Sequence, residues 1–571
     1  MIFELEKTLT NFLSSNANLK TVIDRESLNL FLTPVPEKLK NDFHFATNFA
    51  MILAPKLNQK SIDIANEIAN IFKTIDFIEN VEVLNPGFVN IKLKSEFFAN
   101  LVAQLSENLE SKLIKKMSNG EKLNLEFISA NPTGPLHVAH LRGAVIGDVL
   151  ASILEKVGYN VSREYYINDA GKQMDTLLDS VHFRIKQLKG EIGENEDVPE
   201  GCYPGDYVFE IAKQVIDENK EQNLSRKQIA DIVMEKFIKP TIESLGINYQ
   251  TFSSEQEVIN AKTLEETEKR LNDLGMLYKG FLEKPKGVEI EDYEPAELLL
   301  IKTQQFGDDS DRPLKKRDGS WAYIAPDIAY HYDKFKRGFE KMINIFGEDH
   351  KGYVKRLVAA TKAVTDKKAN LDIKLCGMVN FLKDGEVVKM SKRKNNFLTI
   401  DDMIEELGKD TLRFLMITRK AETVFNFDLE LAKKQTKDNP YFYIQYAHSR
   451  CFSALNVINE AIKNNSFNQQ GSAVVIPWEY QALLCQVVLL SKSIEQSIKS
   501  LDPYFLIDYS IALATALHNL WTAGNGREEL RFASKNHSLA QLNFNKAFVQ
   551  VVKNTIATCL NTAGVQAMEG M

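Results

Sequence analysis

The most constraining feature of the sequence is a strand, a turn and a helix that follow one another over residues 123–157. The strand reads LNLEFIS, and the turn after it is Asn-Pro-Thr-Gly-Pro. NVSREYYI (160–167) reads as a second strand beyond Gly158, which stands at the expected C-terminal cap of the helix. This order predicts a parallel βαβ unit. The helix has apolar residues every three or four positions, which predicts one buried face: Val138, Leu141, Val145, Val149, Ile153 and Val157.

A second unit of the same kind follows much later in the chain. MINIFG (342–347) predicts a strand, HKGYVKRLVAATKAV (350–364) a helix and LDIKLCGMV (371–379) another strand. Two βαβ halves separated by a long insertion predict a split Rossmann-like parallel sheet.

Different patterns occupy the two ends of the chain. Before the polar run KKMSNGEK (115–122), helical stretches alternate with VEVLNPGFVNIKLK (81–94), whose alternation around a Pro-Gly turn predicts strands. From about residue 406 onward the pattern is helical, with no convincing strand. The predicted fold class is multidomain, α/β plus all-α. We expect an α/β module over 1–115, a Rossmann-like domain with an insertion over 116–405 and a helical bundle over 406–571.

Composition narrows the possible classes of protein. The 571 residues carry a net charge of −7, which argues against a general nucleic-acid binder but leaves room for local basic patches. The five cysteines are scattered without CxxC or zinc-ligand spacing, so we expect a reducing compartment, no structural zinc and no metal ligands. No signal-peptide pattern opens the chain, and no apolar run approaches the roughly 20 residues of a membrane span. These features predict a cytoplasmic protein without membrane association.

Two short segments carry candidate chemistry, and the first is HVAH. His137 and His140 stand three apart at a helix start, where backbone N–H groups and the helix dipole favour phosphate. Two imidazoles there can donate hydrogen bonds to phosphates and stabilise developing charge. In isolation, an HxxH pair is more often two polar residues at a helix start.

The second segment is the basic loop VVKMSKRKNN (387–396). Four cations in KMSKRK include Lys389 and Lys392, which can neutralise the charge that builds on a leaving pyrophosphate. An isolated run of this kind is more often a solvated surface loop. The two segments are far more specific together, in this order around two βαβ units.

HVAH followed by KMSKR resembles the paired signatures of class I aminoacyl-tRNA synthetases. The resemblance implies catalytic, phosphate-stabilising roles for His137, His140, Lys389 and Lys392. Ala139 departs from the family, which has glycine where adenine approaches the backbone. Read alone, GEDH (347–350) would be a strand-to-helix turn. The resemblance implies these ATP-binding residues: Pro135, Ala139, Gly347, Asp349, His350, Met390 and Ser391.

Other segments resemble the arginyl branch of that family, and the resemblance runs from about residue 41 to the end of the chain. It implies a ligase that uses ATP with Mg²⁺ to convert L-arginine to arginyl-adenylate and pyrophosphate. The arginine would then pass to the 3′-terminal ribose of tRNA(Arg). We expect a monomer. The segments that carry the resemblance are YINDAGKQ (166–173), WAYIAPDIAYHYDK (321–334), NPYFYIQYAHSR (439–450) and TAGVQAMEGM (562–571).

The same resemblance implies an arginine-binding pocket. A planar guanidinium is recognised best by carboxylates that accept two parallel hydrogen bonds, and Asp327 matches the family's guanidinium partner. Read alone, Asp327 after Pro326 would be a helix cap. The interval from His140 to Lys389 is too short for a large editing domain, which a charged, bidentate ligand does not require. The implied arginine-binding residues are Glu126, Ser129, Asn131, His140, Tyr323 and Asp327.

Two regions imply contacts with tRNA. The stretch that contains Asp42, Phe45 and Asn48 resembles the tRNA-binding N-terminal domain of the arginyl family. Tyr446 and Arg450 are one helical turn apart, and exposed aromatic and arginine side chains suit unstacked anticodon bases. For most rings in this segment, the alternative is a place in the core of the bundle.

Two alternative functions stay open. Another class I synthetase, such as a cysteinyl enzyme, typically has a zinc site that these scattered cysteines do not supply. The other is a catalytically inactive, synthetase-like RNA-binding protein, although both signatures are intact. Gln250, where aspartate is usual, and Asn395, in the basic loop, also depart from the family.

Overall fold

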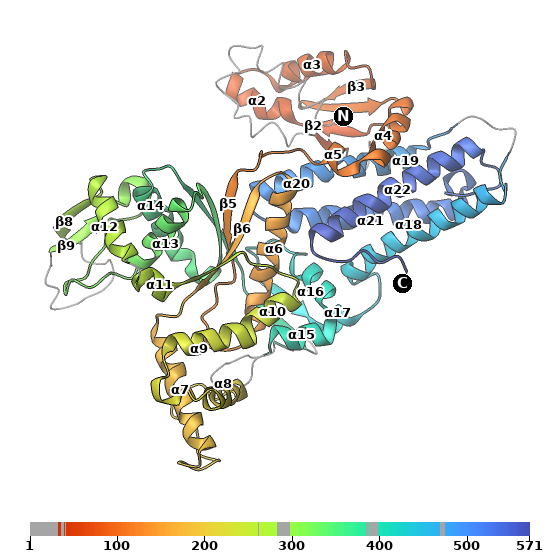
Figure 1. The fold of residues 1–571 in the computed structure, drawn as a ribbon. Helices are drawn as coiled ribbons and strands as arrows, with labels where there is room; N and C mark the ends of the chain where they lie inside the picture. Colours follow the sequence, from red (N-terminus) through yellow and green to blue (C-terminus); the bar gives the residue numbers. More distant parts are fainter. Residues whose placement is uncertain are drawn as a thin grey trace. The chain divides into compact units, whose positions relative to one another are not determined.

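The structure is a computed structural model that describes residues 32–35, 39, 42–260, 262–281, 297–383, 386–387, 398–468 and 474–570. The chain divides into two compact units (Figure 1). One unit is continuous and covers Lys116–Lys434, and the other combines Met1–Lys115 with Gln435–Met571. Residues 406–434 belong to the continuous unit in this division.

A five-stranded parallel sheet forms the centre of the continuous unit, in the order β12-β11-β5-β6-β7. Its core strand β5 (Lys122–Glu126) pairs with β6 (Asn160–Ile167) on one side and with β11 (Lys341–Gly347) on the other. The outer strands are β7 (Thr251–Ser254) and β12 (Asn370–Cys376). The predicted split Rossmann-like sheet is confirmed.

Each predicted βαβ half has its helix. Helix α6 (Leu141–Lys156) connects β5 to β6, and α14 (Val354–Val364) connects β11 to β12. Twelve residues of α6 are buried, and they include Leu141, Val145, Val149 and Ile153 of the predicted apolar face. Because β5 and β11 begin the two halves and lie side by side, their carboxyl ends border the crevice where ligands bind in such sheets.

The insertion between the halves folds into helices and a small antiparallel sheet (Figure 1). The sheet has the order β10-β9-β8, and α13 leads the chain back to β11. The elements are α7 (Lys172–Leu188), α8 (Asp206–Asp217), α9 (Arg226–Val233), α10 (Lys239–Ser244), α11 (Glu255–Asn260), α12 (Thr263–Asp273), β8 (Leu277–Phe281), β9 (Glu297–Ile301), β10 (Arg312–Pro313) and α13 (Ala325–Lys336).

The end of the continuous unit contains a strand that the sequence did not predict. Strand β15 (Phe425–Asp428) pairs in parallel with β13 (Val379–Lys383), which also pairs with β14 (Glu386–Val387). The expectation of no strand after residue 406 is therefore wrong, because the four residues FNFD alternate over too short a span to be distinctive. Helices α15 (Ile400–Leu407), α16 (Lys409–Met416) and α17 (Leu429–Lys433) complete this part.

In the other unit, a four-stranded antiparallel sheet, β1-β2-β4-β3, carries helices of the N-terminal module. The predicted alternating segment forms the hairpin of β3 and β4, joined through Asn85-Pro86-Gly87. The elements are β1 (Leu32–Pro34), β2 (Phe45–Thr47), α2 (Phe49–Leu57), α3 (Ser61–Phe72), β3 (Ile78–Leu84), β4 (Phe88–Leu93), α4 (Ser95–Glu107) and α5 (Leu109–Leu113).

A helical bundle forms the rest of this unit, as predicted. His44 joins the module to the bundle, because its ring stacks on Trp478 at 4.2 Å and its Nε2 lies 3.2 Å from Oε1 of Gln481. No helix in the described ranges is long and apolar enough to span a bilayer. The bundle helices are α18 (Pro440–Lys463), α19 (Trp478–Val488), α20 (Leu490–Lys499), α21 (Tyr504–Gly526) and α22 (Leu539–Thr562).

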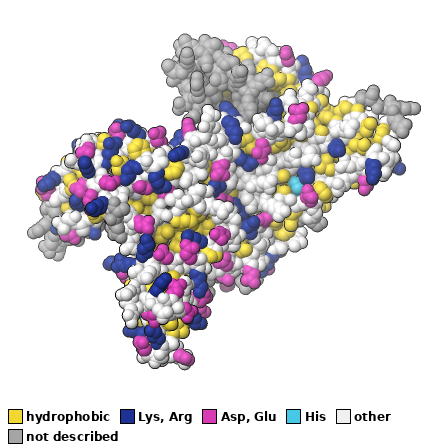
Figure 2. Space-filling view, viewed as in Figure 1, with side chains coloured by type: hydrophobic (Ala, Val, Ile, Leu, Met, Phe, Trp, Pro, Cys, Tyr) yellow, Lys and Arg dark blue, Asp and Glu magenta, His cyan; other side chains and the backbone are white. Residues whose placement is uncertain are grey.

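Acidic and basic side chains are interspersed on the face of the molecule drawn in Figure 2. A net charge of −7 therefore does not reflect one large acidic surface on that face. Local clusters of one charge sign therefore indicate binding sites better than the total net charge does.

Candidate active site

A pocket of about 1040 Å³ opens at the carboxyl ends of β5, β11 and β12. This is the position at which the order of a split parallel sheet reverses. It brings together many residues that the sequence singled out, from segments far apart in the chain. They are Ser129, Asn131, His137, Ala139, His140, Gly347, Asp349 and His350.

The two histidines of the first signature lie side by side at the start of α6. Their ring centroids are 4.0 Å apart, and the 3-10 helix η3 (Val138–His140) leads directly into α6. Both imidazoles line the pocket. Two ring N–H groups can therefore meet one polyphosphate chain at a helix start.

The chain that follows the basic loop runs beside this signature. The amide of Val138 donates to the carbonyl of Leu398 at 3.1 Å, and the amide of Ile400 donates to the carbonyl of Leu136 at 3.0 Å. Lys389, Met390, Ser391, Lys392 and Asn395 themselves lie outside the described residues. The described segment from Leu398 onward is therefore held beside the turn that leads into α6.

The turn after β5 has an unusual backbone that positions polar groups. Ile128 and Ser129 have φ values of 66° and 45°, a left-handed conformation that is sparsely populated by such residues. Ser129 Oγ accepts from the amide of Tyr166 at 3.1 Å and donates to Glu126 at 3.2 Å. Asn131 donates to Gln173 at 2.9 Å. Gly134 is required here, because a Cβ would lie 2.8 Å from the ring of Tyr207.

The carboxylate of Glu126 already has a strong partner. It accepts from the ammonium of Lys334 at 2.6 Å, and the two side chains are only 5% and 0% exposed. The Lys334 ammonium also lies 4.3 Å from the ring centroid of Tyr330. Sequence reasoning missed Lys334, because nothing in a helical pattern shows that a lysine points inward.

Asp327 is not a helix cap. Helix α13 begins at Ala325 with Ile324 at the cap position, and Asp327 makes no capping hydrogen bond. Its carboxylate instead accepts a hydrogen bond from the hydroxyl of Tyr353. Burial, reinforced by Glu126, raises the pKa of Asp327 to about 6. Tyr323 is 80% exposed, with its ring 6.0 Å from that of Tyr353.

Two more carboxylates stand near Asp327, and sequence reasoning missed both as site residues. Burial, with Asp327 and Asp169 as neighbouring charges, raises the pKa of Glu255 to about 7. Asp169 is held by hydrogen bonds from Ser254 Oγ at 2.6 Å and from the amide of Gln256 at 2.9 Å. The available signal was position, since Glu255 directly follows the parallel strand β7 and Asp169 stands two residues after the end of β6.

Gly347 ends β11, Asp349 and His350 follow it, and all three line the pocket. A Cβ at Gly347 would approach Oδ1 of Asp349 to 2.4 Å, and the exposed Asp349 side chain would have to move to admit it. Pro135 is half-buried in the turn before η3 and does not line the pocket.

Comparison with known proteins supplies the deciding observation. The family model "tRNA synthetases class I (R), catalytic domain" matches residues 102–436. The "Arginyl tRNA synthetase N terminal domain" matches residues 5–93, and the "DALR anticodon binding domain" matches residues 444–571. The chain belongs to the arginyl-tRNA synthetase family.

Relatives of this family match the chain over nearly its whole length. The arginine–tRNA ligase of Wolbachia pipientis (strain wPip) is 39% identical over 582 residues, with 99% of each chain covered. That of Ehrlichia chaffeensis is 41% identical over 531 residues, with 90% of each chain covered. The arginyl-tRNA synthetase of Thermus thermophilus has the same fold, with a TM-score of 0.74 at 18% identity over all of both chains.

Two departures from the arginyl-tRNA synthetase pattern have a structural setting. The exposed Ala139 lines the pocket, so its methyl group occupies space that the family's glycine leaves open. The side-chain oxygen of Gln250 accepts from the backbone amide of Arg163 at 2.7 Å. The backbone amide of Gln250 donates to the carbonyl of Arg163 at 3.1 Å. Gln250 therefore supports the approach of β7 to β6.

The residues expected to contact tRNA differ in accessibility. Asp42 and Asn48 are exposed, but Phe45 is fully buried in β2, which leaves its ring unavailable to RNA. Tyr446 is 47% exposed, and the guanidinium of Arg450 lies 4.3 Å from its ring centroid. That guanidinium also lies 5.1 Å from the ring of Trp521, which sequence reasoning did not single out.

Proposed function

We propose that the chain is an arginine–tRNA ligase whose pocket at the carboxyl ends of β5 and β11 performs both steps of the reaction. The observation that carries the proposal is that Glu126, a neighbouring charge of Asp327, accepts a hydrogen bond from Ser129, which lines the same pocket as His137 and His140. A cationic substrate side chain and a polyphosphate would thereby meet at adjoining places in one site.

Asp327 and Glu255 would bind the guanidinium of arginine. Their raised pKa values show that ionised carboxylates are disfavoured there without a cation, and a bound guanidinium would favour the ionised forms. Glu126, held by Lys334, and Ser129 and Asn131 would orient the substrate beside them. Tyr323 would cover the side chain, while His140 would face both substrates.

His137 and His140 would donate hydrogen bonds to the phosphates of ATP, with Lys389 and Lys392 meeting charge on the leaving pyrophosphate. Ala139, Gly347, Asp349, His350, Met390 and Ser391 would surround the nucleotide, and Pro135, which does not line the pocket, would act only by shaping the turn before η3. Glu348 and Asp349 both line the pocket, which fits Mg²⁺, because this ion usually takes one or two carboxylates together with substrate phosphates. When bound, Mg²⁺ would neutralise phosphate charge.

In the first step, a carboxylate oxygen of arginine attacks the α-phosphorus of ATP. The bond from that phosphorus to the bridging oxygen of the β-phosphate breaks, and pyrophosphate leaves. A ribose hydroxyl at the 3′ end of tRNA(Arg) then attacks the arginyl carbonyl, and AMP leaves. The residues named here stabilise phosphate charge, and no covalent enzyme intermediate is required.

The N-terminal module over 1–115 would contact tRNA through Asp42 and Asn48, and the helical bundle that begins at α18 would meet the anticodon through Tyr446 and Arg450. Phe45 would act only by shaping strand β2, which lies between Asp42 and Asn48 in the sequence. We further propose that the enzyme works as a monomer in the cytoplasm.

Arginine-dependent ATP–pyrophosphate exchange, measured with and without tRNA(Arg), tests the proposal. Exchange should depend on arginine rather than lysine or citrulline and should rise strongly when tRNA is added. Lysine keeps the charge and citrulline keeps the planar shape, so both comparisons are needed. RNA binding without exchange under either condition would instead support a catalytically inactive RNA-binding protein.

A further inference from the structure

A second pocket of about 560 Å³ lies at the opposite end of the central sheet. It borders Lys341 and Asn370, which begin β11 and β12, whereas the candidate active site lies where those strands end. Gln305 and Phe306, from the 3-10 helix η6 (Gln304–Phe306), form another side. Nothing in the proposed reaction uses this position.

The pocket lining is strongly basic. It includes Lys341, Lys362, Lys367 and Lys368, with Glu340 as the single acidic residue of the lining; just outside it, Asp372 lies near Lys362 and the exposed Asp366 precedes Lys367. Lys341 pairs with Glu121 at 2.6 Å, so its charge is partly neutralised. The other three lysines, at the end of α14 and in the loop before β12, form what we call the α14–β12 basic face.

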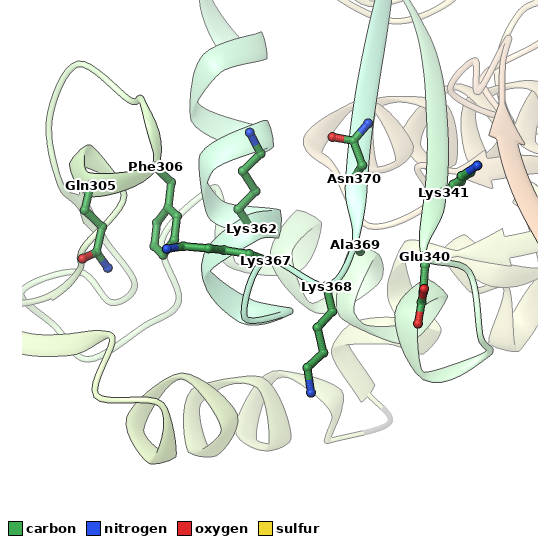
Figure 3. Close-up of a pocket in the computed structure, with 9 residues that line it drawn as sticks. All are labelled: Gln305, Phe306, Glu340, Lys341, Lys362, Lys367, Lys368, Ala369 and Asn370. Carbon is green, nitrogen blue, oxygen red and sulfur yellow. The ribbon is translucent and has the colours of Figure 1, made fainter. Parts of the chain in front are cut away.

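The three lysines of this face do not converge on one point. Figure 3 shows their ammonium groups directed away from one another, with the side chain of Lys367 extending toward Phe306. The ammonium of Lys367 lies 5.5 Å from the centroid of that ring, a cation–π contact that favours this direction. A single small anion would require converging donors, but a chain of successive phosphates can meet separated cations.

The type of cation and its exposure fit the same ligand. Lys367 and Lys368 are exposed, so they can approach a ligand that remains in solvent. Lysine acts as a compact point charge without the fixed bidentate geometry of arginine, which suits sequence-independent contacts to phosphate. The side-chain amide of Gln305 adds a hydrogen-bonding group along the pocket, whereas that of Asn370 already donates to Asp372 at 2.7 Å.

We propose that the α14–β12 basic face binds the sugar–phosphate backbone of RNA, at a site separate from the candidate active site. Binding is electrostatic and independent of base sequence. Glu340 opposes it, because its carboxylate repels phosphate at the same face. This contact would add to those of the proposed anticodon-binding residues and does not depend on them.

The experiment measures binding of the full-length protein to tRNA(Arg) and to polyuridylate over a range of salt concentrations. The double variant Lys367→Gln/Lys368→Gln should bind both RNAs about tenfold more weakly at low salt. The slope of log affinity against log salt should become shallower by about 1.4 to 1.8, as expected when two phosphate contacts are lost. The matched control Lys186→Gln/Lys213→Gln removes two exposed lysines elsewhere in the same unit and should leave affinity and slope nearly unchanged.

Glu340→Gln provides a test of opposite sign. Its exposed side chain contributes only repulsion, so both RNAs should bind several-fold more tightly. Unchanged slopes in the lysine variant, or equal losses in the control, would overturn the proposal. Because arginine-dependent exchange is measured separately, failure of this inference would leave the proposed ligase function standing. Loss of exchange in the unmodified protein would instead count against the ligase function alone.

Discussion

The buried ion pair of Lys334 and Glu126 is the most consequential single contact near the site. Removing one member of a buried pair leaves an uncompensated charge, which usually costs about 3–5 kcal/mol. We expect Lys334→Met to lower the melting temperature by roughly 10 °C and to raise the KM for arginine. Thermal melting and steady-state kinetics on the same variant check both effects.

Lys336→Met is the matched control for that prediction. Lys336 lies in the same helix and pairs with Glu266 at 2.9 Å, but both side chains are exposed. Exposed pairs contribute about 0–1 kcal/mol, so the melting temperature should change little. Equal changes in melting temperature for the two variants would show that the buried ion pair contributes no more to stability than the exposed one.

Asp327 provides a direct test of substrate identity. If its carboxylate binds the guanidinium, Asp327→Ala removes one partner of a desolvated charge pair, at a cost of about 2–5 kcal/mol. The kcat/KM for arginine should then fall by roughly 30- to several-thousand-fold. Asp333→Ala, in the same helix but paired with Arg337 at the surface, should leave kcat/KM near normal. A normal kcat/KM in the Asp327 variant would show that the guanidinium binds at another position.

The pH dependence of arginine use follows from the same carboxylates. Asp327 and Glu255 have pKa values of about 6 and about 7, above the usual range because burial disfavours their charged forms. A cationic guanidinium binds best when both are ionised, so the KM for arginine should rise as pH falls from 8 to 6. Glu255→Gln should remove the upper transition and leave the one near pH 6. A pH-independent KM would contradict this assignment.

The sequence predicted those parts of the site that are local along the chain. His137 and His140 lie at the start of a helix, and Ser129 and Asn131 belong to the preceding turn. The resemblance to a family supplied Asp327 from a distant segment. Glu255, Asp169 and Lys334 were missed because their proximity depends on strand pairing and helix rotation, which no short pattern encodes.

At the scale of elements, Arg142 connects α6 to the segment that carries the far wall of the pocket. Its buried guanidinium donates to the carbonyls of Gly377, Arg419, Lys420 and Thr423, at distances from 2.5 to 3.3 Å. Gly377 also lines the candidate active site. The side chain thereby holds two walls of the pocket in register.

Arg142→Lys should weaken this connection, because one ammonium has three donors and cannot reproduce the planar fork. At least one buried carbonyl would lose its partner, at a cost of about 1–3 kcal/mol. We expect a lower melting temperature and reduced exchange activity. Arg527→Lys, at an exposed ion pair in the bundle, should change neither. Unaltered activity and stability in the Arg142 variant would contradict the connecting role.

Elements with long periodic patterns were predicted well. The spacing of apolar residues predicts helices α6 and α14 and the strands beside them. The need to bury one apolar face determines both the spacing and the type of element. Strand β15 was missed because it exists only through its pairing with β13. The arrangement of short strands depends on partners that are remote in the sequence.

At the scale of the whole molecule, both ends of the chain contribute to one unit, and the candidate active site lies in the other. We expect a variant in which a flexible linker replaces residues 116–434 to fold and melt cooperatively. The stacking of His44 on Trp478 contributes to its stability, so His44→Ala in this variant should lower the melting temperature by a few degrees. Non-cooperative melting of the linker variant would show that this unit depends on the other.

The divided unit has a consequence for synthesis on the ribosome. The N-terminal module emerges first, but Trp478 and Gln481, which receive His44, are translated only after the whole continuous unit. At typical elongation rates this delay is on the order of 15–60 s. During that time the buried face around Phe43 and His44 lacks its partner helix, whereas by its end the continuous unit has every residue it needs to fold. A chain whose translation stops after Lys434 would therefore contain a folded continuous unit attached to an N-terminal module without its bundle. The apolar surface of that module would stay exposed.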